Sequence, residues 1–164
     1  MSYTIKMNQI LFSNITIFLA SFLIWFMFAG LIILWVIDGR MRKEQVLHTI
    51  LAMLIAWTLS TMIKSLFPSP RPFEVNGAMP LTLTTPSGGS FPSNHAAVAF
   101  SLAVSIWLHN KKVGNYFLIL AVLVGTGRML GNVHYFLDIL GGAVLGIITA
   151  VGVEKLHLFK LLKK

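Results

Sequence analysis

One stretch restricts the fold of this chain more than any other. From Ile15 to Ile37 there are 23 residues without a charged side chain. A helix of about 20 apolar residues crosses the hydrocarbon core of a bilayer, where only helices and closed barrels satisfy every backbone polar group. We therefore expect a transmembrane helix here. We expect it to be retained, because the basic start, shorter apolar run and small-residue cleavage site of a signal peptide are not evident.

The composition extends this expectation to the whole chain. Of 164 residues, 56% are hydrophobic and only 11% are charged, whereas roughly 25% of residues in soluble domains are charged. The mean hydropathy is +0.80. We predict an all-α fold, a polytopic integral membrane helix bundle of about five transmembrane helices, in a single domain over residues 1–164. The absence of cysteine excludes disulfides and thiolate metal sites.

Further helices are predicted on both sides of the first span. Residues 1–14 mix polar and apolar side chains and predict a short interfacial helix, or a sixth span if they enter the membrane. Charged turns are predicted at 38–44 and at Asn110-Lys111-Lys112. The later spans are predicted at about 46–66, 93–109 (with Ser93 as its N-cap), 113–130 and 134–153.

The positive charge is distributed as in membrane proteins. The net charge is +8, and nine of the thirteen Lys and Arg lie in 40–43, 111–112 and 155–164, beside apolar segments. Cytoplasmic loops carry such an excess. We therefore expect the N-terminus outside, the C-terminus inside and no nucleic-acid partner. The basic tail 154–164 lies either on the anionic inner leaflet or in solvent, and His48 is interpreted as a structural or interfacial residue.

One long loop, 67–92, contains all six prolines and the Gly88-Gly89 pair. Regular helix is disfavoured through most of it, and loops of this length in compact domains are usually functional or mobile. Two interpretations stay open for residues 73–90. Their apolar side chains would either lean into lipid and guide a substrate, or belong to a disordered connection.

In this topology the unusual polar residues gather at one end of the bundle, the extracytoplasmic one. Ionisable groups there are costly unless they are paired or functional. Lys64, Arg71 and Arg128 bring three cations together, with only Asp138 and Glu74 to offset them. Forked guanidinium groups suit phosphate oxygens, and the free amides at the start of the third span add anion donors. The excess of cations predicts a phosphate-bearing ligand.

Two histidines belong to the same end of the bundle. His134 and Asp138 are four residues apart, so on a helix they share a face, and the carboxylate can hold Nδ1–H while Nε2 stays reactive. Together with His95 as a proton donor, these groups fit phosphoryl transfer without a required metal. Six residues place side chains on roughly opposite helix faces. A bend at Gly131-Asn132 is therefore needed to bring Arg128 beside His134.

These motifs resemble the signature of the type 2 phosphatidic acid phosphatase (PAP2) superfamily, which includes vanadium haloperoxidases and glucose-6-phosphatase. The family pattern Lys-x6-Arg-Pro is complete from Lys64 to Pro72, and Arg-x5-His-x3-Asp is complete from Arg128 to Asp138. Two positions depart from the family. Residues 92–95 read Pro-Ser-Asn-His instead of Pro-Ser-Gly-His, and a glycine precedes Arg128 where serine is usual. The resemblance covers roughly 46–153.

The resemblance implies a role for each motif residue. His134 is similar to the nucleophile that forms a phosphohistidine, and Asp138 to the residue that orients it. His95 is similar to the acid that protonates the leaving group and later activates water. The resemblance implies no metal and no cofactor, and it implies a phosphate cradle made of Lys64, Arg71, Ser93, the amide of Asn94, and Arg128.

The short chain and the sequences of residues 90–95 and 134–142 are similar to those of bacterial undecaprenyl-diphosphate phosphatases of this superfamily. We therefore expect a multi-pass protein of the bacterial inner (cytoplasmic) membrane with an extracytoplasmic active site. The expected partners are membrane lipids and a lipid phosphate substrate. The expected substrate is undecaprenyl diphosphate, which would be hydrolysed to undecaprenyl phosphate. A phosphatidylglycerophosphate, phosphatidate or lipid A 1-phosphatase would use the same residues. The alternative from another class is a lipid-phosphate binding or transport protein. A family member that had lost catalysis would be expected to lose a histidine first, and both His95 and His134 are present, which favours the enzyme.

Overall fold

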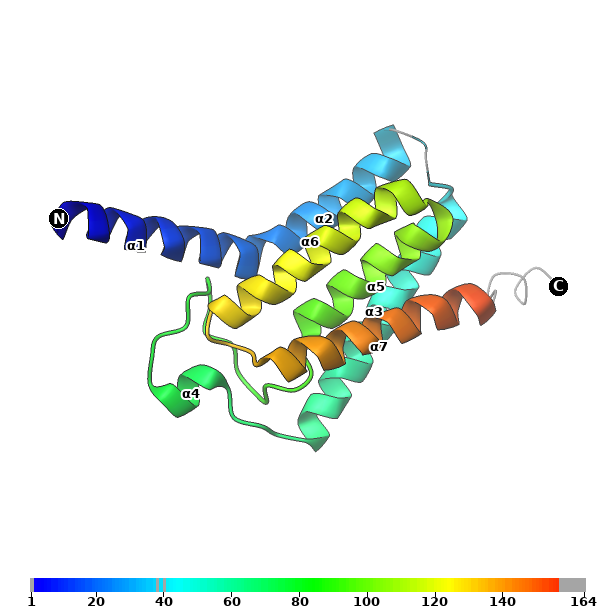
Figure 1. Cartoon of the computed structure of the whole chain (residues 1–164). Helices are drawn as coiled ribbons and strands as arrows, with labels where there is room; N and C mark the ends of the chain where they lie inside the picture. The colour runs from blue at the N-terminus through cyan, green and yellow to red at the C-terminus, as the bar shows by residue number, and fades with distance from the viewer. Residues whose placement is uncertain (1, 38, 40, 157–164) are drawn as a thin grey trace.

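A computed structural model describes residues 2–37, 39 and 41–156; the tail beyond 156, expected at the membrane surface or in solvent, lies outside the described residues. All regular structure in the described part is helical, which confirms the predicted all-α fold (Figure 1). The elements are α1 (Ser2–Ile17), the π-helical η1 (Phe18–Phe22), α2 (Leu23–Ile32), the π-helical η2 (Ile33–Ile37), α3 (Lys43–Leu66), α4 (Pro72–Asn76), α5 (Asn94–His109), α6 (Lys111–Leu130) and α7 (Phe136–Leu156).

The first predicted span is part of a longer helix. α1, η1, α2 and η2 follow one another without a non-helical residue, and Ile5–Val36 is long and apolar enough to cross a membrane. Figure 1 shows α1 projecting away from the bundle, whereas α2 runs along α6. The direction changes near η1, and π-helical turns are common sites of such bends. A helix in residues 1–14 is thus present from Ser2 onward.

Four helices of the described chain are long and apolar enough to span a membrane, against about five predicted. The third predicted span is also helical, as α5, and Ser93 is its N-cap as expected. Its 16 residues reach only about 24 Å at 1.5 Å per residue, less than the ~30 Å of the hydrocarbon core. α5 is the central helix, in contact with α3, α6 and α7.

The packing of α5 against α7 depends on glycine. A Cβ atom at Gly142 would lie 2.5 Å from the carbonyl oxygen of Ser93, and one at Gly146 would lie 2.3 Å from that of Ala97. Both distances are too short for any side chain, so the two backbones touch directly. Small residues four apart allow helices to pack this closely, and the contact places the start of α5 against the start of α7.

Two turns reverse the chain at opposite ends of the bundle. Asn110 alone separates α5 from α6, and its side chain accepts a hydrogen bond from Val113 N–H at 3.1 Å. The three-residue turn predicted there was wrong, because an extended asparagine caps α6 and lets Lys111 begin the helix. At the other end, Asn132 has a φ of 61°, a left-handed conformation that asparagine tolerates. The predicted reversal at Gly131-Asn132 is confirmed.

The proline-rich loop is hydrogen-bonded to this second turn, at Gly131 and Asn132. Phe73 N–H donates to the Asn132 carbonyl at 3.1 Å, and Leu81 N–H donates to the Gly131 carbonyl at 3.0 Å. One short helix, α4, interrupts the loop, in keeping with the expectation that most of it is irregular. The loop therefore lies on the end of the bundle where α6 finishes and α7 begins (Figure 1).

Candidate active site

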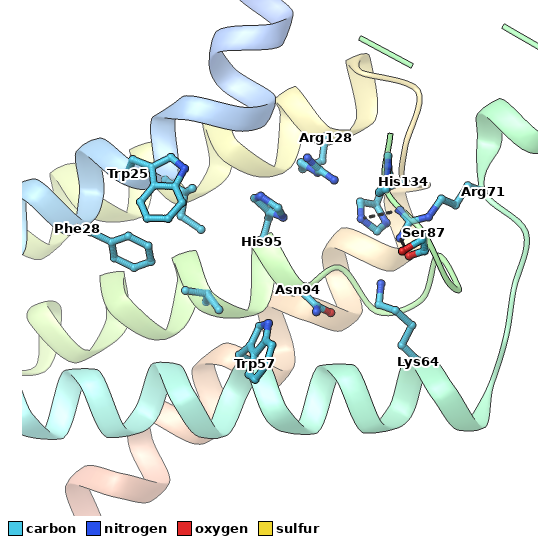
Figure 2. A pocket seen from close by; sticks show the side chains of 13 residues that line it. Trp25, Phe28, Trp57, Lys64, Arg71, Ser87, Asn94, His95, Arg128 and His134 are labelled. Atoms are coloured by element: carbon cyan, nitrogen blue, oxygen red, sulfur yellow. Dashed lines mark hydrogen bonds between the residues drawn. The ribbon is translucent and has the colours of Figure 1, made fainter. Parts of the chain in front are cut away.

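A cavity of about 350 Å³ opens at the end of the bundle that carries the proline-rich loop. Figure 2 shows its polar part, where side chains from α3, α5, α6 and the loops converge, and its apolar part, between α2 and α3. The polar lining consists of Lys64, Arg71, Ser87, Asn94, His95, Arg128 and His134. The apolar lining consists of Ile24, Trp25, Phe28, Trp57, Pro86 and Val98.

His134 is buried in the loop immediately before α7. Its Nδ1 lies 3.3 Å from Oδ2 of Asp138, which belongs to the first turn of α7 and also accepts the Tyr135 N–H at 2.8 Å. The expectation that His134 lies on the helix was wrong, but the four-residue spacing still brings the two side chains together. In the tautomer that donates from Nδ1, Nε2 carries the lone pair, and it lies 3.4 Å from Arg71 Nη1.

Ser90 is a functional candidate that the sequence did not reveal. It is fully buried; its hydroxyl donates to Asp138 Oδ2 and lies 3.4 Å from His134 Nδ1. Its backbone N–H is held by the Ser69 carbonyl at 2.8 Å. The carboxylate behind the imidazole is therefore hydrogen-bonded from the side, and its orientation is set by the loop as well as by α7. Ser90 directly precedes the Phe-Pro-Ser motif, but no spacing rule links it to a residue 48 positions away.

Arg71 connects the loop to His134. Its buried guanidinium donates to the carbonyls of Val133 (3.0 Å), Gly88 (3.0 Å) and Gly89 (3.1 Å). Its Nη1 also lies 3.4 Å from His134 Nε2. Burial lowers the pKa of Arg71 from its ordinary value, yet an arginine stays charged at neutral pH. Arg71 therefore places a positive charge beside His134 Nε2.

Lys64 approaches the same loop from the last turn of α3. Its Nζ donates to the Gly89 carbonyl at 2.9 Å and to the Ser90 carbonyl at 3.3 Å. An ammonium group has three protons, so this position leaves donor capacity toward the cavity. Lys64 and Arg71 together hold the loop by its carbonyl oxygens.

Arg128 has a donor without a partner. It is buried at the end of α6, and its Nη1 donates to the Ala20 carbonyl of η1 at 3.0 Å. Its buried Nε has no hydrogen-bond partner among the described residues. A buried unsatisfied donor costs about 1–3 kcal/mol, and more for a charged group. Because the side chain lines the cavity (Figure 2), an anion bound there would supply the missing partner.

The glycine before Arg128 has a structural reason. A Cβ atom at Gly127 would lie 2.6 Å from the Leu19 carbonyl carbon and 2.7 Å from the Ala20 nitrogen. The backbone of η1 thus occupies the space that a serine side chain would need. The departure from the family pattern is therefore coupled to the same η1 contact that holds Arg128.

The start of α5 contributes His95 and Asn94 to the cavity. The Asn94 side chain is used within the bundle: its oxygen accepts from Ser60 Oγ at 2.7 Å, and its nitrogen donates to Thr61 Oγ1 at 3.1 Å. These bonds fasten α5 to α3. The first amides of a helix have no helical acceptor, so the N–H groups at this end are suited to an anion.

Ser93 lies beneath the cavity rather than in its lining. Its amide donates to the Asp138 carbonyl at 3.0 Å, and its hydroxyl accepts the Ala96 N–H at 3.4 Å. In this geometry Ser93 caps α5 and joins it to α7. Its assignment as a phosphate ligand stays a prediction.

The charges of the site favour an anion and a neutral nucleophile. Three cationic side chains, Lys64, Arg71 and Arg128, face the cavity, whereas the carboxylate of Asp138 lies behind His134. Burial lowers the pKa of His134 to about 4, against the opposing effect of the Asp138 hydrogen bond. The positive charges of the two arginines act in the same direction as burial. At neutral pH the imidazole is therefore unprotonated.

Six of the eight residues predicted from the sequence line one cavity, with Asp138 behind His134 and Ser93 under the start of α5. The model of the PAP2 superfamily matches residues 45–160. The chain belongs to the PAP2 superfamily. This fold places the family's three motifs around one cavity, although the individual roles of their residues stay predictions.

Two curated relatives are similar over most of the chain. The bacitracin transport permease protein BcrC of Bacillus licheniformis is 32% identical over 134 residues, 82% of this chain and 66% of that protein. The undecaprenyl-diphosphatase BcrC of Bacillus subtilis (strain 168) is 26% identical over 141 residues, 86% of this chain and 72% of that protein. The chain thus spans just under two thirds of the first relative. The family and the second relative indicate a phosphatase, that is, a hydrolase.

Two solved structures resemble the whole bundle. Aquifex aeolicus LpxE has a TM-score of 0.71 at 30% identity, covering 91% of this chain and 86% of its own. A transmembrane PAP2-type phosphatidylglycerolphosphate phosphatase from Bacillus subtilis has a TM-score of 0.59 at 27% identity, covering 89% of this chain and 74% of its own. These similarities, with the four candidate spans, make this a multi-pass membrane protein.

Proposed function

We propose that this protein cleaves phosphate from a membrane lipid through a phosphohistidine formed on His134. One observation carries the proposal: Arg128, whose buried Nε has no partner among the described residues, and the His134 imidazole border the same cavity. A phosphoryl group placed between them would accept from the guanidinium and receive the attack of Nε2. The same group would compensate for the excess of positive charge.

The first chemical step transfers the phosphoryl group to the protein. Nε2 of His134 attacks phosphorus and the bond from phosphorus to the leaving oxygen breaks. His95, in the protonated form that the bound phosphate anion stabilises, gives that oxygen a proton. Asp138 stabilises the positive charge that develops on the imidazole. Arg71, Arg128 and the amides at the start of α5 stabilise the phosphoryl oxygens. No step in this scheme requires a metal ion.

The second step releases phosphate. His95, now neutral, takes a proton from a water molecule as the water oxygen attacks phosphorus. The bond between phosphorus and Nε2 breaks, and the electron pair returns to the imidazole of His134. Inorganic phosphate leaves, and both histidines recover their initial protonation states.

The apolar part of the cavity favours a lipid substrate. Trp25 and Phe28 of α2 lie on one side of it and Trp57 of α3 on the other (Figure 2). Trp25 is 63% exposed and Trp57 is 51% exposed, as expected for side chains that face lipid. A hydrocarbon chain lying between α2 and α3 would stay in the bilayer while its phosphate reaches His134.

Undecaprenyl diphosphate is the substrate that we propose first, because a relative similar over 86% of this chain is an undecaprenyl-diphosphatase. Its cleavage would release phosphate and leave undecaprenyl phosphate. A phosphatidylglycerolphosphate is the second candidate, favoured by the similarity to a solved phosphatase of that lipid. Both substrates present a terminal phosphate on an apolar anchor and would use the same residues.

The proposed setting is the bacterial inner membrane, with the cavity on the extracytoplasmic side. Lys111 and Lys112 lie at the opposite end of the bundle from the cavity, together with the start of α3. Cytoplasmic ends of membrane helices are enriched in such cations. The polyprenyl headgroup would then be hydrolysed in the outer leaflet.

The proposal is tested by phosphate release from purified protein in detergent with EDTA present. Undecaprenyl diphosphate, phosphatidylglycerolphosphate and phosphatidate are compared as substrates, for wild type, His134→Ala and Lys112→Ala. We expect wild type and Lys112→Ala to be equally active and His134→Ala to be at least 1,000-fold slower, since the nucleophile is absent (about 4 kcal/mol in the barrier). Full activity of His134→Ala would refute the nucleophile assignment. Binding without turnover by wild type would favour the transport role named for the Bacillus licheniformis relative.

A further inference from the structure

Three potential metal ligands meet at the end of the bundle remote from the cavity. His48 belongs to the second turn of α3, His109 is the last residue of α5, and Glu154 lies near the end of α7. Each side chain offers one ligand atom, and the three atoms lie within 4.8 Å of one another. No sequence motif connects them, because they are 61 and 45 residues apart along the chain.

Two of the three distances between ligand atoms match a shared cation. His48 Nδ1 and His109 Nε2 both lie 3.3 Å from Oε2 of Glu154. A tetrahedral ion bound at about 2.0–2.2 Å from each ligand holds neighbouring ligand atoms roughly 3.3–3.6 Å apart. Two imidazole nitrogens and one carboxylate oxygen form a ligand set typical of zinc and similar divalent ions.

A hydrogen-bonded trio explains only part of this geometry, because His48 Nδ1 is within hydrogen-bonding geometry of Glu154 Oε2 at 3.3 Å but His109 is not. His109 Nε2 is buried and has no hydrogen-bond partner of acceptable geometry among the described residues, although it faces Oε2. Its distance of 3.3 Å exceeds the usual ~2.9 Å of an N–H···O bond. An imidazole nitrogen that binds a metal directs its lone pair at the ion and not at the neighbouring ligand atom. His109 Nε2 lies close to Glu154 Oε2 but outside hydrogen-bonding geometry, which fits this arrangement.

The cluster is separate from the candidate active site. His48 and Lys64 are 16 residues apart on α3, which is about 24 Å along a helix, and the spacing from Asp138 to Glu154 on α7 is the same. The lysines at the same end as the cluster, Lys43, Lys111, Lys112 and Lys155, are exposed. Solvent screens their repulsion of a cation, whereas the side chains of His48 and His109 are only 6% and 12% exposed.

We infer that His48, His109 and Glu154 bind a divalent transition-metal ion that joins α3, α5 and α7 at the end of the bundle opposite the catalytic cavity. A water molecule takes the fourth position. The ion is structural: it connects the three helices that carry Lys64, His95 and Asp138 at their other ends. It takes no part in phosphoryl transfer, so the site is independent of the proposed function.

Zn²⁺ is the probe for this site. Full-length protein in detergent, with its affinity tag removed, is stripped with EDTA and equilibrated with Zn²⁺, and bound zinc is measured by mass spectrometry. We expect about one zinc per chain for wild type, and less than about 0.2 for His109→Ala and for Glu154→Gln. We also expect Zn²⁺ to raise the Tm of wild type but not that of Glu154→Gln, because binding stabilises only a folded state that has the site.

Control variants separate the two histidine clusters. His95→Ala is expected to keep one zinc per chain while losing phosphate release. His109→Ala and Glu154→Gln are expected to remain monodisperse on size exclusion and to keep phosphate release. Wild-type protein that binds no zinc would overturn the inference. So would zinc binding that is unchanged in both Glu154→Gln and His109→Ala. Replacement of Zn²⁺ by Co²⁺ gives a second reading, since strong visible absorption is expected for a four-coordinate site.

Discussion

The hydroxyl of Ser90 contacts both Asp138 Oδ2 and His134 Nδ1. Ser90→Ala removes one hydrogen bond from a charged carboxylate and leaves the imidazole less firmly oriented. Such bonds contribute about 1.5–3 kcal/mol, so we expect kcat to fall about tenfold or somewhat more, with little change in KM. The measurement is steady-state phosphate release. The matched control is Ser65→Ala, whose exposed hydroxyl bonds only to its own helix and whose loss is expected to be neutral.

Burial of His134 has a consequence for the pH profile. With the pKa of His134 lowered to about 4, the free enzyme keeps its nucleophile unprotonated down to that pH. Below it, each further pH unit lowers the unprotonated fraction of His134 about tenfold. We therefore expect the acid limb of kcat/KM, which reports the free enzyme, to lie near pH 4 and well below the ordinary histidine value of 6.5. The profile is measured in detergent, with circular dichroism to confirm the fold.

Asp138→Asn is the companion variant for this profile. The Asp138 hydrogen bond raises the pKa of His134, so its weakening is expected to move the acid limb to lower pH while kcat decreases. An acid limb at pH 6.5 in wild type, unmoved in Asp138→Asn, would contradict the assignment of this limb to His134.

Individual residues of the site were predictable to different degrees. Residues that belong to local motifs, such as His134 and Asp138, were expected together because four residues make one helical turn. Ser90 was not, since its contact with Asp138 depends on how the long loop is folded. The unpaired Nε of Arg128 was also beyond the sequence, because it follows from the approach of Ala20 to only one arm of the guanidinium.

At the scale of helices, the contact of α7 with α5 is sensitive to one methyl group. Gly146→Ala would place a Cβ 2.3 Å from the Ala97 carbonyl oxygen and 2.8 Å from the Ser101 nitrogen. The helices would have to separate, at a cost of about 1–3 kcal/mol. We expect a lower Tm and reduced activity, because the same interface joins Ser93 to Asp138.

Gly152→Ala is the control on the same helix. No atom lies within 4 Å of a Cβ at Gly152, and alanine favours a helix by up to about 1 kcal/mol over glycine. We expect this variant to keep or raise the Tm measured by thermal unfolding in detergent. Equal destabilisation by both substitutions would show that close packing is not the reason for Gly146.

The apolar part of the cavity between α2 and α3 predicts a difference between substrates. Trp57→Ala removes an aromatic wall, and we expect KM for undecaprenyl diphosphate to rise about tenfold, or roughly 1.4 kcal/mol. Turnover of p-nitrophenyl phosphate, which has no lipid chain, is expected to stay within about twofold. Trp35→Ala is the control, since Trp35 is exposed on η2 and does not line the cavity. Equal effects on both substrates would argue against a lipid path here.

Helices were more predictable than their ends. The apolar segments indicated α3, α5, α6 and α7, because uncharged runs between charged turns mark buried or lipid-facing helices. The continuity of α1 with α2 was not indicated, since the polar residues of 1–14 interrupt the apolar run without breaking the helix. The turn at Asn110 was predicted to include Lys111 and Lys112, but both belong to α6. Charged lysines are compatible with the first turn of a helix at a membrane surface, so their charge did not mark the end of the turn.

At the scale of the whole molecule, the described bundle has two chemically different ends. One carries the loop, the cavity and the cations around His134, and the other carries the His48, His109 and Glu154 cluster together with exposed lysines. The two ends are about 24 Å apart along α3 and along α7, which run in opposite directions. The positive-inside rule predicts that the lysine end faces the cytoplasm, which is the orientation that the proposed function needs.

This orientation can be tested because the chain has no cysteine. Thr84→Cys introduces a thiol in the exposed part of the proline-rich loop, and Lys112→Cys introduces one at the exposed start of α6. We expect a membrane-impermeant maleimide to label Thr84→Cys on intact cells and to label Lys112→Cys only after permeabilisation. Both variants should keep phosphate release, since neither residue contacts the candidate nucleophile. Labelling of Lys112→Cys from outside, with Thr84→Cys protected, would place the cavity in the cytoplasm and exclude hydrolysis in the outer leaflet.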